Sequence, residues 1–135
     1  MTDGELLTAF EACSMSTEQF THREHVRVAW MYASCHSLPE AINRMRSGIK
    51  AFNKATNTPE ALDRGYHETI TVAFMKLVFG ANAESGSHES SDDFCSDHSE
   101  LLDRFVLRRY YSRERILTWE AKSKFVEPDL SPLPA

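Results

Sequence analysis

Apolar residues recur every three or four positions along most of the chain, which is the period of an amphipathic helix. No run of alternating Val, Ile or Thr residues predicts a strand. The pattern therefore predicts an all-α fold, a compact bundle of five or six helices. The expected helices cover residues 3–14, 22–37, 39–55, 66–82, 98–110 and 112–124.

Local signals predict where two of these helices begin. Thr21, followed three residues later by Glu24, matches a capping box. In such a box the hydroxyl accepts a bond from a free backbone N–H and the carboxylate bonds back to the cap. Pro39 suits the first turn of the third helix, because its missing N–H is not needed there.

The chain of 135 residues predicts a single helical domain over residues 1–135. Residues 84–97 are rich in Ser, Asp and Glu and contain no Lys or Arg, which predicts a flexible acidic loop. A lid or a partner-binding segment is the alternative, because long loops in compact domains are often functional. Residues 126–135 contain three prolines and predict an extended tail.

Charge and cysteine content narrow the class of protein. The 20 acidic residues outnumber the 15 Lys and Arg residues, giving a net charge of −5, which argues against a nucleic-acid binder. The start of the chain lacks an apolar core, and the apolar stretch 70–81 is too short to span a bilayer. Cys13, Cys35 and Cys95 have no disulfide or metal spacing. We therefore expect a cytoplasmic protein with free thiols and no membrane partner.

Histidines supply the first candidate chemistry. His22 and His25 lie one turn apart on the expected second helix, so both imidazoles can approach one point. The same face continues through Tyr32 and His36, with apolar residues on both sides. A polar stripe in such a position predicts a lined site that faces inward. A His-x-x-His pair can bind a divalent metal ion together with a third ligand.

A second cluster, Tyr66-His67-Glu68, begins the most apolar expected helix. His67 is the candidate third metal ligand or general base, with Tyr66 or Glu68 to orient it. Glu68 or His36 is the candidate auxiliary ligand. The alternative is a hydrogen-bonded histidine near a helix terminus.

The sequence also resembles a family of small helical proteins to which no reaction is assigned. The resemblance rests on three blocks and covers most of residues 20–134: Phe-Thr-His-Arg-Glu-His from residue 20, Tyr-His-Glu-Thr-Ile-Thr from residue 66, and a C-terminal block from Leu101 that ends in Phe-Val-Glu-Pro-Asp and Pro-Leu-Pro. Residues 84–96 depart from the shared pattern. The resemblance supports the choice of the histidines and implies no particular chemistry.

Arginines form a third cluster, between residues 104 and 115, together with Tyr110 and Tyr111. A solvated helix face paired with the acidic loop is one interpretation. The other is a clamp for a substrate carboxylate or phosphate, because the guanidinium fork matches such anions. Under that interpretation, Arg109, Arg113 and Tyr111 bind the substrate.

The function expected from these clusters is a small metal-dependent enzyme of lyase, hydrolase or oxygenase type that acts on a small acidic molecule. Zn or Fe would bind to His22, His25 and His67. The expected catalytic residues are His67, Glu68, Tyr66 and Tyr32. One alternative is a metal-free enzyme that uses the histidines and tyrosines for acid–base chemistry. Another is a non-enzymatic small-molecule-binding or interaction module, and the sequence leaves a homodimer open.

Overall fold

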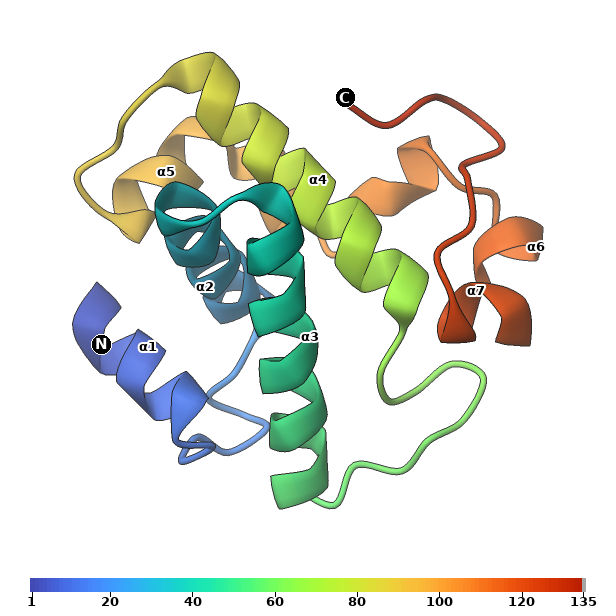
Figure 1. Ribbon diagram of the computed structural model, residues 1–135, viewed down its shortest axis with the longest axis horizontal. Coiled ribbons are helices and arrows are strands. Elements are labelled where there is room, and N and C mark those ends of the chain that lie inside the picture. The colour runs from blue at the N-terminus through green and yellow to red at the C-terminus, as the bar shows by residue number, and fades with distance from the viewer. Residues whose placement is uncertain (135) are drawn as a thin grey trace.

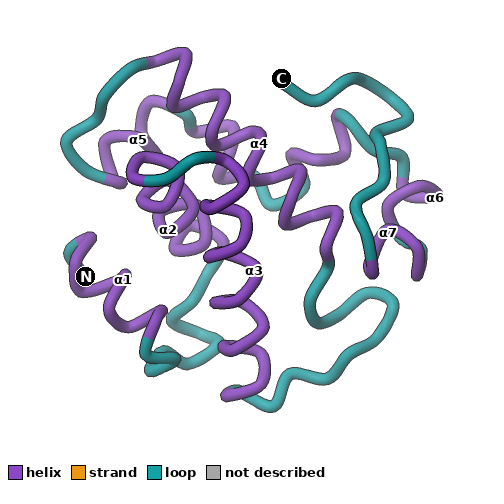
Figure 2. The backbone as a smooth tube through the Cα atoms, viewed as in Figure 1, coloured by secondary structure: helices purple, strands orange, loops and turns teal. Residues whose placement is uncertain are grey.

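The structure is a computed structural model that describes residues 1–134. Within this range all regular elements are helical and none is a strand, which confirms the all-α prediction (Figure 2). The α-helices are α1 (Asp3–Glu11), α2 (His22–Cys35), α3 (Leu38–Ala55), α4 (Glu68–Ser85), α5 (Ser91–Asp97), α6 (Arg113–Ile116) and α7 (Trp119–Ser123), and two 3₁₀ helices are η1 (Ser99–Leu102) and η2 (Val106–Arg109).

Helix α2 is the centre of the core. It packs against α1, α3, α4 and α5, and every residue from 26 to 33 is buried. Helix α4 runs diagonally between this group and the C-terminal part of the chain, where it packs against α7 (Figure 1). Helix α4 therefore joins the group of helices around α2 to a C-terminal segment of short helices.

The predicted capping box at the start of α2 is wrong. Helix α2 begins where expected, at His22, but Thr21 makes no side-chain bond to the helix backbone. Its hydroxyl donates to the carboxylate of Glu24 instead, at 3.1 Å. A capping box is present at α1, where Thr2 and Glu5 bond to each other's backbone N–H at 3.1 and 2.8 Å.

The predicted flexible loop over residues 84–97 is largely ordered as helix. Helix α4 continues to Ser85, and Gly86, with φ of 79°, ends it. Helix α5 then begins after Ser90, whose hydroxyl accepts from the backbone of Asp93. Phe94 and Cys95 are fully buried in the core. The acidic residues lie on either side of these two buried residues in the sequence. Only residues 86–90 connect α4 to α5 without helical structure.

The expected helices over 98–110 and 112–124 are each broken into two short elements, η1 and η2, and α6 and α7. Residues 126–134 contain no helix, in agreement with the predicted extended tail. Ala135, the last residue of that prediction, lies outside the described residues. The backbone of Leu130 donates to the carbonyl of Tyr110 at 2.9 Å, and Asp129 accepts two bonds from Ser112. The tail therefore holds the short elements in place.

Between residues 1 and 134, every helix is too short or too polar to cross a lipid bilayer.

Candidate functional site

His22 and His25 occupy the first turn of α2, and each has one ring nitrogen bound to a backbone carbonyl. Nε2 of His22 donates to the carbonyl of Leu101 at 2.8 Å, and Nδ1 of His25 donates to the carbonyl of Thr21 at 2.9 Å. Because a carbonyl can only accept, these contacts fix the tautomers of the neutral rings. Nδ1 of His22 and Nε2 of His25 then carry lone pairs and have no hydrogen-bond partner within residues 1–134.

Both histidines line a cavity of about 300 Å³ between α2, α3 and α4, which we call the histidine cavity. Its other walls are mainly apolar and include Met45, Ile49 and Phe74. Burial lowers the pKa of His25 below its usual value, and the nearby His22 adds to this effect. A neutral His25 with a free lone pair is suited to accept a proton.

His67 is the N-cap residue of α4, and both of its ring nitrogens are engaged. Nδ1 accepts from the backbone N–H of Ile70 at 3.1 Å, while Nε2 donates to the carbonyl of Ile116 at 2.9 Å. Burial also lowers the pKa of His67, which favours the neutral ring that these two bonds require. Neither nitrogen can act as a metal ligand or a base while both bonds are present. The hydrogen-bonded histidine at a helix terminus is therefore the interpretation that the geometry supports.

The structure does not bring His22, His25 and His67 together. Groups of three or more potential ligands whose donor atoms lie within 4.8 Å of one another were found in the described part of the chain only at His88, Asp97 and His98. His67 lines a different cavity from the other two histidines. The zinc or iron centre expected at the three histidines is thus not assembled, because His67 points along the helix end towards Ile116.

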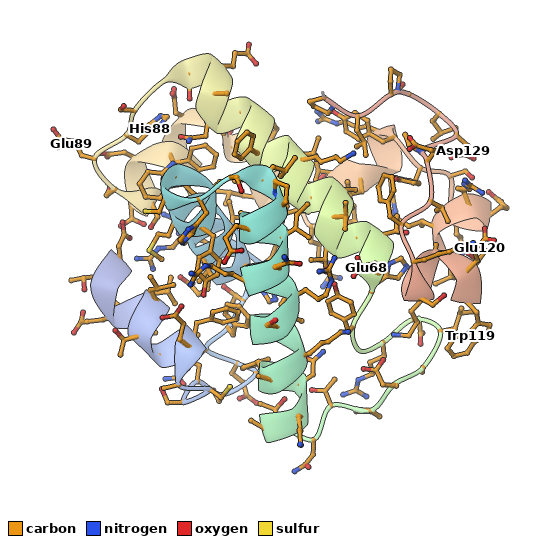
Figure 3. The ribbon with its side chains drawn as sticks, in the orientation of Figure 1. Glu68, His88, Glu89, Trp119, Glu120 and Asp129 are labelled. Carbon is orange, nitrogen blue, oxygen red and sulfur yellow. The ribbon has the colours of Figure 1, made fainter. Side chains whose placement is uncertain are left out.

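Glu68 and Tyr66 belong to an ion-pair network. Glu68, which is labelled in Figure 3, forms a bidentate salt bridge with Arg46 of α3, with distances of 2.9 and 2.6 Å. It also accepts from the Tyr66 hydroxyl at 2.5 Å. Burial and this bond to Glu68 raise the pKa of Tyr66 to about 12. The pair therefore joins α3 to the start of α4, and neither residue lines the cavity of His67.

Tyr32 and His36 also lie apart from the predicted site. The Tyr32 hydroxyl donates to Glu11 of α1 at 2.9 Å, and burial together with this bond raises the pKa of Tyr32. His36 is the C-cap of α2, at the opposite end from His22. The predicted stripe thus contains two histidines at a cavity and a tyrosine that joins two helices.

A second cavity, of about 360 Å³, lies between the start of α4 and the C-terminal short helices, and we call it the arginine cavity. His67 and Asp63 are part of its wall. Its cationic residues are Arg64, Arg104, Arg108, Arg113 and Lys122. Lys122 is buried and bound to Glu60 and to two carbonyls. The four arginines form no salt bridge within residues 1–134.

Two of the three predicted substrate-binding residues line this cavity. Arg113 and Tyr111 line it, whereas Arg109 does not, although both arginines are exposed. The Tyr111 hydroxyl donates to the carbonyl of Val126 at 2.7 Å, and burial raises its pKa to about 12. Tyr111 therefore offers its ring, and not its hydroxyl, to a bound molecule. Arg104 and Arg108 belong to the predicted arginine cluster but not to the expected substrate-binding residues, and they complete the basic wall by packing on the ring of Phe105.

The two cavities adjoin. Ile70, Arg104 and Leu107 line both of them, so these three side chains form the boundary between the histidines and the arginines. The site that emerges is an apolar space with lone-pair nitrogens at one end and unpaired guanidinium groups at the other.

Comparisons with profiles of known families, with curated proteins and with solved structures found no match to the chain.

Proposed function

We propose that the protein binds a small carboxylic acid with an apolar body, and that the acid group lies in the arginine cavity. The observation that carries the proposal is the set of four arginines without carboxylate partners in a chain whose net charge is −5. Acidic residues are plentiful, yet Asp63 is the one that lines this cavity. The four arginines are exposed and hydrated, and their convergence on one cavity is what favours an anion there.

The other residues that line the two cavities indicate that the rest of the ligand is apolar. The histidine cavity is lined mainly by apolar side chains, the arginine cavity combines apolar and charged ones, and the two adjoin at Ile70 and Leu107. Volumes of about 360 and 300 Å³ lie at the lower end of those that bind small molecules. A medium-chain or aromatic acid, with its carboxylate at Arg104 and its apolar body towards the histidines, fits this arrangement.

The test is titration of octanoate into the full chain by calorimetry, with 1-octanol as the neutral ligand of similar shape. Arg104→Gln should weaken octanoate binding roughly 10- to 100-fold, the loss expected for a charge-assisted hydrogen bond. Arg109→Gln is the matched control, since Arg109 belongs to the same run but does not line the cavity. Equal weakening by the two substitutions, or equal binding of octanol and octanoate, would refute the proposal.

A second candidate function is metal-free acid–base catalysis on the bound acid, and the neutral ring of His25 favours it. Nε2 of His25 is the free base in the histidine cavity. A keto acid whose carbonyl is far from its carboxylate offers an acidic C–H at the histidine end, so the wild type should exchange deuterium from D₂O into 6-oxooctanoate faster than buffer does. His25→Gln should abolish that acceleration, whereas octanoate should still bind to this variant. Exchange at the wild-type rate in this variant would exclude His25 as the base.

A further inference from the structure

A separate cluster of histidines lies where the connection between α4 and α5 meets the end of α5. His88 belongs to that connection (Figure 3), Asp97 is the last residue of α5, and His98 is its C-cap. Nε2 of His88 is 3.1 Å from Oδ2 of Asp97, and Nε2 of His98 is 4.0 Å from the same oxygen. One donor atom from each of the three residues lies within 4.8 Å of the other two.

These separations match what a zinc-type ion requires. Ligands about 2.1 Å from a tetrahedral ion are roughly 3.4 Å from one another. The two measured contacts with Asp97, at 3.1 and 4.0 Å, lie on either side of that value. Two imidazoles and one carboxylate are also a donor set that divalent zinc, cobalt and nickel accept.

The surroundings of the cluster support a cation. Nδ1 of His98 is 3.5 Å from a carboxylate oxygen of Glu100, the type of outer partner that orients a metal-bound imidazole. The hydroxyl of Ser85 is 2.9 Å from Nε2 of His98 and adds an oxygen beside the donor atoms. The side chain of His88 is 10% exposed, and this burial holds its Nε2 towards Asp97.

We propose that His88, Asp97 and His98 bind one divalent transition-metal ion of the zinc class. The ion would link residues 86–90 to the C-terminal end of α5. Without an ion, the side chains of His88 and Asp97 are joined by a single hydrogen bond. This site is independent of the histidine and arginine cavities, since none of its three residues lines either of them. Its role is to fix the α4–α5 connection, because a ligand that binds the folded state alone stabilises that state.

The experiment uses the full chain without a histidine tag, stripped with a chelator and titrated with Co²⁺. Visible absorption reports tetrahedral binding, and Zn²⁺ is then added to displace the cobalt. We expect one ion per chain. At 100 times the dissociation constant, the ion should lower the unfolded fraction about 100-fold, seen as a higher melting temperature. An absence of stoichiometric binding to the wild type would overturn the proposal.

Variants locate the ion. Asp97→Asn should weaken binding at least tenfold, and because Asp97 is an exposed side chain the stripped variant should melt like the stripped wild type. His98→Gln should abolish binding. His36→Gln and His22→Gln are the matched controls, since both residues are partly exposed histidines outside the cluster, and His22 belongs to the centre expected from the sequence. Loss of the ion in either control, or its retention in Asp97→Asn and His98→Gln, would contradict the assignment.

Discussion

Replacing His67 tests whether this histidine has a structural role or a catalytic one. Its ring caps α4 through Ile70 and reaches across to the carbonyl of Ile116. A side-chain N-cap contributes about 1 kcal/mol, and a further hydrogen bond contributes about 1 kcal/mol. His67→Ala should therefore lower the free energy of unfolding by about 2 kcal/mol. For 135 residues, this corresponds to a fall in melting temperature of about 7 °C.

His67→Asn is the informative partner variant. Asparagine is among the best N-cap residues, so the bond to Ile70 is retained and only the contact with Ile116 is lost. The expected fall is about half that of the alanine variant. Calorimetric melting of the three proteins at pH 7.5 gives the comparison. An alanine variant as stable as the wild type, or an asparagine variant as damaged as the alanine variant, would refute this account of His67.

The difference in stability between the wild type and His67→Asn should depend on pH. Burial lowers the pKa of His67 in the folded state below its ordinary value of 6.5. As the pH falls, the unfolded chain therefore takes up a proton first, and stability decreases with it. The contribution of His67 is complete above pH 6.5 and is lost as the pH falls from there through the folded-state pKa. His25 has a shift of the same sign, so the test is the difference between wild type and His67→Asn. A constant difference between pH 7.5 and 5 would contradict the argument.

Two further substitutions test the contacts that hold the ends of the chain. Arg27 is 6% exposed and bonds to Ser91, Glu24, Asp3 and the carbonyl of Met1, so Arg27→Met should cost about 3 kcal/mol in urea unfolding by leaving two partly buried carboxylates unpaired. A loss below 1 kcal/mol would contradict this role. Tyr111→Phe removes the bond to Val126 and should cost about 1 kcal/mol, with faster proteolysis of the tail as the second readout.

The long helices were predictable from the sequence because their apolar period is regular. Helices α2, α3 and α4 begin within about two residues of the expected positions. Helix α5 was missed because it is short and its composition is acidic, so propensity predicts a loop. Its stability comes from tertiary contacts, namely the burial of Phe94 and the bonds from Ser91 to Asp3. No local pattern around residue 91 contains that information.

The candidate site was predictable in its parts and not in its arrangement. Spacing on one helix predicted that His22 and His25 lie side by side, and both line the histidine cavity because they belong to a single rigid element. His67 failed as their partner, since its position at the N-cap turns the ring towards Ile116. The arginines were noticed as a cluster, but a continuous helix over residues 98–110 would have presented them differently from the two 3₁₀ helices that the structure contains. The sequence did not predict the cluster of His88 and His98, because nine residues separate the two histidines and no common metal-binding motif has that spacing.

The order of the elements along the chain has a consequence for biosynthesis. Helices α1 to α4 leave the ribosome before residues 104–122 and can pack together while those residues are being made. The cavity wall comes mostly from residues 104–122, which the tail holds through Tyr111 and Thr69. A nascent chain thus forms the arginine cavity only after residues 104–122 have followed α4 out of the ribosome. Under the proposed function, a carboxylic acid in the cell would rescue chains that fail in this later closure, but not chains in which α1 to α4 fail to assemble.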